Sequence, residues 1–576
     1  MKILVVYLSL MFLVFLLSCS IQKTEDGKFE ALANNYIEKF LEMNPEWATY
    51  LGNHRYDHRL NDYSLESVER EINFHKTYLD SLSSIQENRL SLVNKIDYKI
   101  LRTNLELMIF ELDILKEYEW NPLEYNIGGA IYGLIAREFA PLKERLLNVK
   151  ERLKAVPSVL EHAKKNLINP PKIHIETAIL QNKGNIKLVR DDLKKFLDQV
   201  PELKAEFAPA QSQAVAALKE YGKWLQQELL PKSTGEFRIG DKKFRRKLRY
   251  ILESGLSKEE ILQRAEADLK KTQNAMYETA LPLFKKYLPE ITDTKKLDDK
   301  KLVIKTVLDK LAEAHPTNET IVELAKESLQ SCSDFVRSHN LMTVPEEPIK
   351  IIVMPEFQRG VAVAYCDPPG PLEEKRKTFY SISPTPQDWS EKRVESFFRE
   401  YNNYMLENLT VHEAMPGHYL QLAHANKFKA PTKVRAIFSS GTFVEGWATY
   451  AEQLMVEKGY GGPEVKMQQL KMRLRLIINA IIDQKIHTEG MTEKEAMNLM
   501  MNQGFQEEGE AAGKWRRACL TSTQLSTYYI GNTEINDLRN AFEAKMKKVI
   551  DMKAMHDKML SFGSPAPKYV KELLRL

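Results

Sequence analysis

Apolar residues recur at intervals of three and four between charged ones from about Phe29 to Leu230. Residues at these spacings share one face of a helix, so the pattern predicts a series of amphipathic helices. The segment Leu230-Pro231-Lys232-Ser233-Thr234-Gly235 interrupts the pattern with turn-forming residues. We place a boundary there, between an amino-terminal helical lobe of residues 29–235 and a second helical lobe of residues 236–576.

The pattern changes between about residues 348 and 383. Three short runs rich in β-branched and aromatic residues, 349–353, 361–365 and 378–382, predict strands of a small β-sheet. The Pro- and Gly-rich segment 367–371 predicts a loop, and helical spacing returns near Asp388 or Ser390. No repeat of fixed period is visible, which disfavours a solenoid. The expected fold is mainly α, with two helical lobes around a cleft and a small β-sheet.

The composition indicates a globular protein. Of 576 residues 28% are charged, and only 24 are Gly and 25 Pro, which excludes collagen-like, low-complexity and wholly disordered chains. The 83 basic side chains nearly balance the 79 acidic ones, giving a formal charge of +4. Because this charge is nearly balanced, we expect no nucleic-acid partner.

The amino terminus has the pattern of a secretion signal. Residues 3–17 are apolar but for Ser9 and follow Lys2, and the run is too short to span a bilayer. The sequence Leu16-Leu17-Ser18-Cys19 resembles a bacterial lipobox. We therefore expect a signal peptide (1–18), a lipid on Cys19, a tether (19–28) and a membrane-tethered lipoprotein facing the periplasm. The alternative is a plain secretory signal with an incidental cysteine.

Residues that could bind a metal ion and activate water cluster around residue 412. His412-Glu413 is followed by Met415-Pro416-Gly417-His418, so two imidazoles flank a carboxylate. This combination suits a hydrolytic zinc site, in which Glu413 takes a proton from metal-activated water. In a regular helix, positions i and i+6 lie about 120° apart. We expect Pro416 and Gly417 to widen the helix locally and turn His418 back toward His412. Solvated histidines at a helix end are the alternative.

A second helix, 441–452, offers further carboxylates. Glu445 lies far enough beyond His418 for a turn and a helix to bring it back as the third zinc ligand. Glu452 is seven residues further and on the same face, where it could hold a ligand histidine or be a solvated acid. Three protein ligands leave the fourth zinc position for water.

Other candidates have structural alternatives. Either Tyr528 or Tyr529 could stabilise an oxyanion, or both could be core residues. Arg475, Asn479, Asp483 and His487 form a polar stripe every four residues along an apolar helix. Such a stripe favours a buried network over the lining of a substrate channel.

Several of these motifs together resemble bacterial proteins of the domain-of-unknown-function 885 family. The motifs are the lipobox, the string from His412 to His418, Glu445-Gly446-Trp447-Ala448-x-Tyr450-x-Glu452, Tyr528-x-x-Gly531, the segment Asn44–Gly52 and Tyr365-x-x-Pro368-Pro369. This family looks similar to helical, gluzincin-type zinc peptidases such as thimet-type oligopeptidases, carboxypeptidase Taq and angiotensin-converting enzyme.

The resemblance implies roles for individual residues. It implies that His412, His418 and Glu445 bind one zinc ion, with Glu413 as general base. Tyr528 matches the family tyrosine better than Tyr529 does, and Arg517 falls near the family's arginine. Ser522-Thr523 stands where many members have Pro-Gly. By analogy with related peptidases, the strands beside the metal helix bind the substrate backbone, with Tyr365 among the binding residues.

The sequence thus predicts a zinc metallopeptidase that hydrolyses peptide bonds of oligopeptides. Arg475 and Arg517 are candidates for binding a terminal carboxylate, although salt bridges are the favoured alternative for both. His487 is a substrate-binding candidate if the polar stripe lines a channel. The rival functions are a metal-dependent hydrolase of a non-peptide amide or ester, and a catalytically silent peptide-binding lipoprotein. The base Glu413 favours an enzyme over a binding protein.

Overall fold

The computed structural model describes residues 24–291, 297–354, 363–373, 377–387, 389–546 and 551–576. Across these residues the fold is mainly α with a single three-stranded sheet, which confirms the predicted fold class. The predicted signal peptide, Cys19 and the first part of the tether lie outside the described residues. No helix in the described ranges combines the length and apolarity required to cross a membrane.

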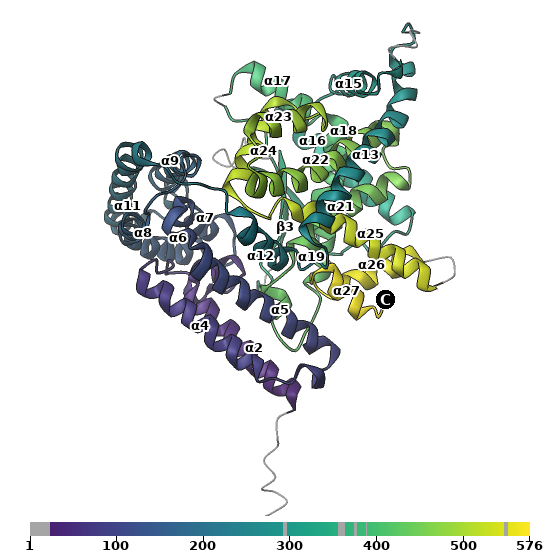
Figure 1. Cartoon of the computed structure of the whole chain (residues 1–576). Coiled ribbons are helices and arrows are strands. Elements are labelled where there is room, and N and C mark those ends of the chain that lie inside the picture. Colours follow the sequence, from purple (N-terminus) through teal and green to yellow (C-terminus); the bar gives the residue numbers. More distant parts are fainter. Residues whose placement is uncertain (1–23, 292–296, 355–362, 374–376, 388, 547–550) are drawn as a thin grey trace, which may run out of the picture.

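The amino-terminal part consists of antiparallel helices, seen in purple and blue in Figure 1. They are α2 (Glu25–Met43), α3 (Pro45–Tyr50), α4 (Leu65–Ser83), α5 (Leu92–Ile109), α6 (Glu117–Trp120), α7 (Gly128–Ala136), α8 (Leu142–Asn166), α9 (Lys172–Lys187), α10 (Lys194–Leu197) and α11 (Lys204–Trp224). The periodic apolar residues of α8, including Leu146, Val149 and Leu153, are buried in a core shared by α7, α8, α9 and α11. The period of the sequence therefore identifies the buried face of this helix.

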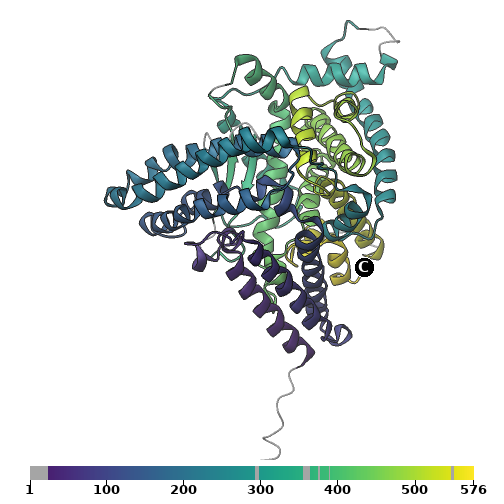
Figure 2. The same cartoon turned by 60° about the vertical axis from the view of Figure 1, so that its left-hand side comes forward.

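The second part of the chain forms a larger helical body (Figure 2). It contains α12 (Gly240–Leu252), α13 (Lys258–Tyr287), α15 (Lys300–Leu311), α16 (Ile321–Ser338), α17 (Glu391–Glu400), α18 (Asn403–Glu413), α19 (His418–Ala425), α20 (Val434–Ile437), α21 (Gly441–Glu457), α22 (Gly462–Glu489), α23 (Glu493–Asn502), α24 (Glu508–Leu520), α25 (Ser526–Met546), α26 (Met552–Leu560) and α27 (Pro567–Leu573). Helix α22 is buried over most of its length and forms the centre of this body.

The sheet has the strand order β1-β3-β2, with β1 (Ile349–Val353) parallel and β2 (Ala364–Asp367) antiparallel to β3 (Thr378–Ile382). Strands β1 and β3 have the predicted bounds. Strand β2, the second along the chain, begins at Ala364, later than predicted, and residues 361 and 362 lie outside the described residues. Tyr380 of β3 bonds to Thr410 of α18 at 2.9 Å, so the sheet is attached to the helix that carries His412.

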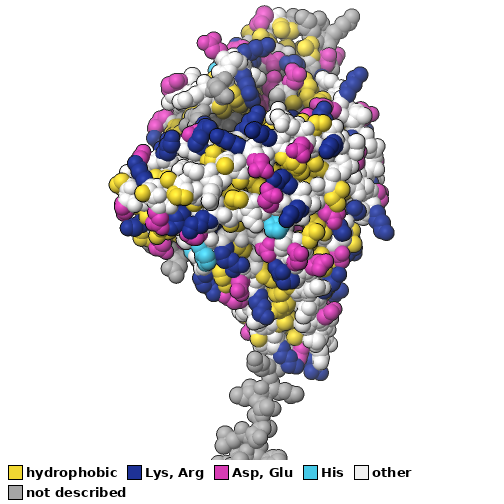
Figure 3. Space-filling model, turned by 90° about the vertical axis from the view of Figure 1, so that its left-hand side faces the viewer, with side chains coloured by type: hydrophobic (Ala, Val, Ile, Leu, Met, Phe, Trp, Pro, Cys, Tyr) yellow, Lys and Arg dark blue, Asp and Glu magenta, His cyan; other side chains and the backbone are white. Residues whose placement is uncertain are grey.

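The two parts of the chain also share a core. Buried residues of α2 and α5 pack with Val434 and Ile437 of α20 and with Tyr569 of α27. The first helices are therefore anchored on the carboxy-terminal half, and the boundary near residue 235 stays a prediction. On the face seen in Figure 3, basic and acidic side chains are interspersed, in keeping with the balanced composition.

Candidate metal centre

The chain between His412 and His418 breaks the helix instead of widening it. Helix α18 ends at Glu413 and α19 begins at His418, and the turn between them contains the cis Met415–Pro416 bond. The Gly417 amide donates to the Val411 carbonyl at 2.9 Å. A Cβ atom on Gly417 would lie 1.8 Å from the His412 carbonyl oxygen. The predicted widening is therefore wrong: His418 returns to His412 through a tight turn that only glycine can make.

Helix α21 places Glu445 between the two histidines. Glu445 Oε2 lies 3.6 Å from His412 Nε2 and 3.5 Å from His418 Nε2. The imidazole rings are nearly perpendicular, with centroids 4.7 Å apart. The indole of Trp447, two residues after Glu445, donates to the Pro416 carbonyl at 2.9 Å. This bond ties α21 to the turn between the histidines, so the three side chains converge as the sequence predicts.

Glu452 and Asn408 orient the first histidine. Glu452 Oε1 lies 2.7 Å from His412 Nδ1, and its other oxygen accepts a 2.7 Å bond from Asn408. Glu452 is only 1% exposed, so it is not the solvated acid that was the alternative. With Nδ1 occupied in this way, Nε2 of His412 faces Glu445 and is free to act as a ligand.

The three side chains fit a zinc ion. Two ligands each about 2.0–2.1 Å from a tetrahedral zinc lie about 3.4 Å apart, close to the two separations involving Glu445. Glu445 Oε2 is buried and has no hydrogen-bond partner among the described residues, a gap that a cation would fill. Burial favours the neutral acid, but His412 and His418 outweigh it and lower the pKa of Glu445. The donor set of two imidazoles and one carboxylate is common in catalytic zinc sites.

Glu413 faces the edge of the sheet. Its Oε2 accepts a 2.9 Å hydrogen bond from the Cys366 amide. Strand β2 lies at the edge of the sheet, and this amide points away from its partner β3. The carboxylate next to the first histidine is thus held between the metal centre and a strand whose outer edge is unpaired within the described sheet.

Two glycines bring the tyrosine of α25 to the centre. Helices α21 and α25 cross where Gly446 meets Gly531, and a Cβ on Gly446 would lie 2.4 Å from the Gly531 carbonyl carbon. Because Glu445 precedes Gly446 and Tyr528 lies one turn before Gly531, the close crossing brings the Glu445 carboxylate and the phenol together. Burial and the charge of Glu445 raise the pKa of Tyr528 to about 12, so the phenol keeps its proton.

The two tyrosines have different partners. Tyr529 bonds to Asp268 of α13 at 3.0 Å and is buried in the core. The Arg517 guanidinium instead lies 3.1 Å from the Tyr528 hydroxyl and donates to Gln524 at 2.8 Å. Tyr528, and not Tyr529, is therefore the tyrosine that faces the metal centre. Ser522-Thr523, which stands in the preceding turn in place of the family's Pro-Gly, does not prevent this placement.

The polar stripe on α22 forms the buried network that the spacing favours. Arg475 pairs with Glu400 at 2.6 Å and with Glu510 at 3.5 Å. The Asp483 carboxylate accepts bonds from the amides of residues 523 and 526, and His487 Nε2 lies 2.9 Å from the Ala518 carbonyl. Arg475 and His487 are thus used within the protein, which argues against the substrate-binding role that was the alternative for both.

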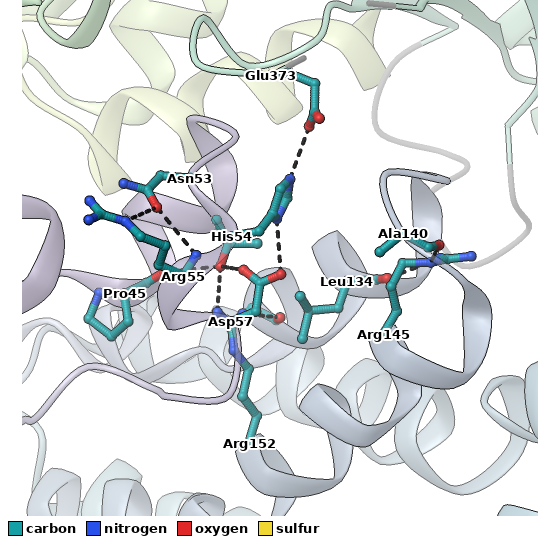
Figure 4. A network of polar contacts seen from close by, with 12 residues as sticks. Pro45, Asn53, His54, Arg55, Asp57, Leu134, Ala140, Arg145, Arg152 and Glu373 are labelled. Carbon is teal, nitrogen blue, oxygen red and sulfur yellow. Dashed lines mark hydrogen bonds and ion pairs between the residues drawn. The ribbon is translucent and has the colours of Figure 1, made fainter. Parts of the chain in front are cut away.

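The amino-terminal segment holds the loop that follows β2. His54 bridges Asp57 at 2.9 Å and Glu373 of the loop at 3.1 Å (Figure 4). The Leu372 amide donates to the Leu51 carbonyl, also at 2.9 Å. Arg137 of the segment after α7 pairs with the Asp367 side chain at the end of β2, two residues after Tyr365. Two of the family-like motifs, residues 44–52 and 365–369, therefore lie next to each other and support the strand beside Glu413.

Some residues of the centre have weak signals in the sequence. Asn408 lies four residues before His412, so a polar side chain on the ligand face of α18 could have been noticed. Lys514 of α24 lies three residues before Arg517 and hence on the same helix face, which is its only signal in the sequence. The Cys366 amide has no signal in the sequence, since any residue carries that group.

The chain is similar to uncharacterised bacterial proteins. One family profile, described as bacterial protein of unknown function (DUF885), matches residues 45–574. A candidate lipoprotein of unknown function from Shewanella oneidensis has a solved structure with a TM-score of 0.81 and 34% identity, covering 95% of this chain and 100% of its own. A candidate lipoprotein from Colwellia psychrerythraea shares the fold at 17% identity and a TM-score of 0.77, covering 96% of this chain and 100% of its own. No curated protein matches the chain.

Proposed function

The chain belongs to the bacterial DUF885 family, and we propose from its metal centre that it is a zinc-dependent hydrolase of peptide bonds in oligopeptides. The observation that carries the proposal is the convergence of His412, His418 and Glu445, whose ligand atoms all lie within 4.8 Å of one another. Glu413 stands directly beside the first of these ligands. A protein that only binds peptides has no need of such a base, which favours an enzyme.

Zinc in such a site lowers the pKa of water and polarises a carbonyl group. Glu413 accepts the proton of the attacking water and passes it to the leaving amine. Tyr528, which keeps its phenolic proton, donates a hydrogen bond to the oxygen of the scissile carbonyl as negative charge develops on it. Arg517 holds Tyr528 in place through the 3.1 Å contact.

The outer edge of β2 supports a peptide as the substrate. An extended peptide can add to an exposed strand through main-chain hydrogen bonds. Strand β2 has such an edge, and its Cys366 amide already contacts Glu413. A peptide bound there lies next to the base. A non-peptide amide or ester would use the same water chemistry but would not need this edge, and a substrate panel separates the two.

The candidate lipoproteins that share the fold support a membrane tether. The lipobox at Cys19 precedes α2, which begins at the narrow lower end of the molecule in Figure 1. We expect the lipid to hold the protein at the membrane in the periplasm, with peptides as substrates.

Replacing Glu413 tests the mechanism. The purified protein should contain about one zinc per chain and cleave members of a quenched peptide library. Glu413→Gln should keep the zinc and lose about 10²–10⁴-fold in kcat, because the base is removed but the ligands remain. Metal content is measured by mass spectrometry with and without chelator. Full activity in this variant would contradict the assigned role of Glu413.

Glu445→Ala tests the metal site separately. It should lower the zinc content, since a ligand is lost. The matched control is Glu457→Ala on the same helix, whose side chain is exposed at the surface and distant in sequence from the ligand. Equal zinc content in the Glu445 and Glu457 variants would remove Glu445 from the ligand set.

A further inference from the structure

Helix α24 presents one row of charged residues toward the metal centre. Glu510, Lys514 and Arg517 follow one another at intervals of four and three, which places them on one helix face. The first and last have fixed partners. Glu510 pairs with Arg475 and bonds to Tyr401 at 3.3 Å, and Arg517 bonds to Gln524 and Tyr528. This row therefore reaches the oxyanion-binding tyrosine at its carboxyl end.

Lys514 lies between these two and has no such partner. It makes no hydrogen bond or ion pair with any described residue. The side chain is half-buried, and the charges of Glu510, Arg475, Arg517 and Glu445 act on it. Burial raises the pKa of Glu510, but the charges of Arg475 and Lys514 outweigh it and lower this pKa, so the two cations share the one carboxylate. Cations taken out of bulk water are normally hydrogen-bonded to an acid of their own, so the Lys514 ammonium has capacity for a further anion from outside the chain.

Lys514 remains a cation under ordinary conditions. Burial is the main cause that lowers its pKa, and the net result is a value of about 8. At neutral pH most molecules therefore carry the charge, but with less water around it than a surface lysine has. Such a partly desolvated ammonium binds a carboxylate more strongly than an exposed one does.

Resting on the proposed function, we infer that Lys514 binds the terminal carboxylate of a peptide substrate, with Arg517 beside it, so that the enzyme trims peptides from the carboxyl end. Arg517 contacts Tyr528, and Lys514 lies one turn away along α24. One turn spans about 5 Å and an extended peptide about 3.5 Å per residue, which places the cut within about one to three residues of that end.

A pair of probe peptides tests the inference. The two have the same sequence and differ only in a free acid or an amide at the carboxyl end. The zinc-loaded protein should cleave the acid with about 10–100-fold higher kcat/KM, the range expected for one charge-assisted contact, and release short carboxy-terminal fragments. Lys514→Met should abolish this preference by lowering kcat/KM for the acid to the value for the amide. Lys514→Arg should restore part of it, and the exposed Lys494→Met on α23 should behave as the wild type does.

Binding gives a readout that is independent of turnover. In the Glu413→Gln background, Kd for the acid should be about 10–100-fold lower than for the amide, and Lys514→Met should equalise them. Equal cleavage of acid and amide by the wild-type protein, with equal Kd values, would overturn the carboxylate site and leave the hydrolase intact. If neither probe peptide nor any library member is cleaved, the proposed hydrolase activity is wrong, and the inference fails with it.

A third probe separates two sources of carboxylate. It carries a carboxy-terminal amide and a glutamate as its last residue. If this peptide is bound and cleaved as well as the free acid, the site recognises an acidic side chain, and the assignment to a chain terminus is wrong. Poor cleavage of this probe, together with loss of the acid preference in Lys514→Met, supports the terminal carboxylate.

Discussion

The missing Cβ atoms of three glycines decide how closely the helices of the metal centre approach one another. Gly417 lies against the His412 carbonyl, and Gly446 lies against the backbone of Gly531. A methyl group at any of these positions would occupy space that another backbone already fills. The glycines therefore set the distances between α18, α19, α21 and α25, and through them the spacing of the ligands and Tyr528. The geometry of the site therefore depends on these glycines as much as on its polar residues.

Glu452 offers a test of orientation at the residue scale. Glu452→Gln keeps the shape of the side chain but removes the charge that supports His412. Zinc should bind about 10–100-fold more weakly, because partners of a ligand histidine fix its tautomer and ring position. Zinc affinity is measured by competition with a chromophoric chelator. The free energy of unfolding of the zinc-free variant serves as a control, and unchanged zinc affinity would contradict the role.

At the scale of elements, strand β2 is held from two sides. Its Cys366 amide bonds to Glu413, and the loop after it is bound by the segment around His54 (Figure 4). Arg152 also reaches this segment and donates to Thr49 at 2.6 Å, while Thr49 donates to Asp57 at 2.7 Å. A network of the amino-terminal helices thus supports a strand that lies beside the candidate metal centre, which explains why the two regions share one folded unit around the site.

The His54 contact makes the stability of this junction depend on pH. Burial lowers the pKa of His54, but Asp57 and Glu373 outweigh it and raise the pKa above its ordinary value. The charged imidazole therefore contributes stability that is complete below about pH 6.5 and is lost as the pH rises through the raised pKa. Glu373→Gln should cost about 1 kcal/mol at pH 5.5 and less at pH 9.

Urea unfolding at several pH values measures this difference. Glu278→Gln on α13, an exposed residue, is the matched control and should change stability little at any pH. A cost of Glu373→Gln that does not vary with pH would show that the charge on His54 does not stabilise the junction.

At the scale of the whole molecule, the buried hydrophobic residues form several separate cores. One core lies mainly in α7–α11, and another joins α2 and α5 to α20 and α27. A third lies behind the metal centre and contains Val411, Phe443 and Trp447. The first helices of the chain are therefore part of the same folded body as the site. We expect the lipid at Cys19 to be the attachment to the membrane.

Replacing residues 1–19 by a plain secretion signal tests the tether. The variant should lose the mass of the lipid and move from the membrane fraction to the soluble one, because both the lipidated cysteine and the apolar signal are removed. Cell fractionation with immunoblotting, and mass spectrometry of the amino terminus, measure both effects. The zinc content of the released protein should equal that of the wild type. Continued membrane association without lipid would contradict the assignment.

The periodic and alternating patterns predicted much of the fold. Helices with one apolar face, such as α8, and the strands β1 and β3 have the expected positions, because local spacing decides which face can be buried. The convergence of His412, His418 and Glu445 could also be predicted, since few residue types are suited to bind zinc and all three stand in two short motifs. The bounds of β2 and the conformation of the turn at Pro416 could not be predicted from the sequence, because they depend on contacts with residues far along the chain.

From the sequence alone one could name the candidate ligands and the candidate base, because the type of side chain decides which residues can bind a metal or accept a proton. Only the tertiary structure revealed that the helix breaks between the histidines, that Glu452 is buried on His412, and that Tyr528 rather than Tyr529 faces the centre. Within the described part of the chain, it also left the Lys514 ammonium without a hydrogen bond. These outcomes depend on which distant backbones can approach each other and on which charges are already paired, and packing decides both.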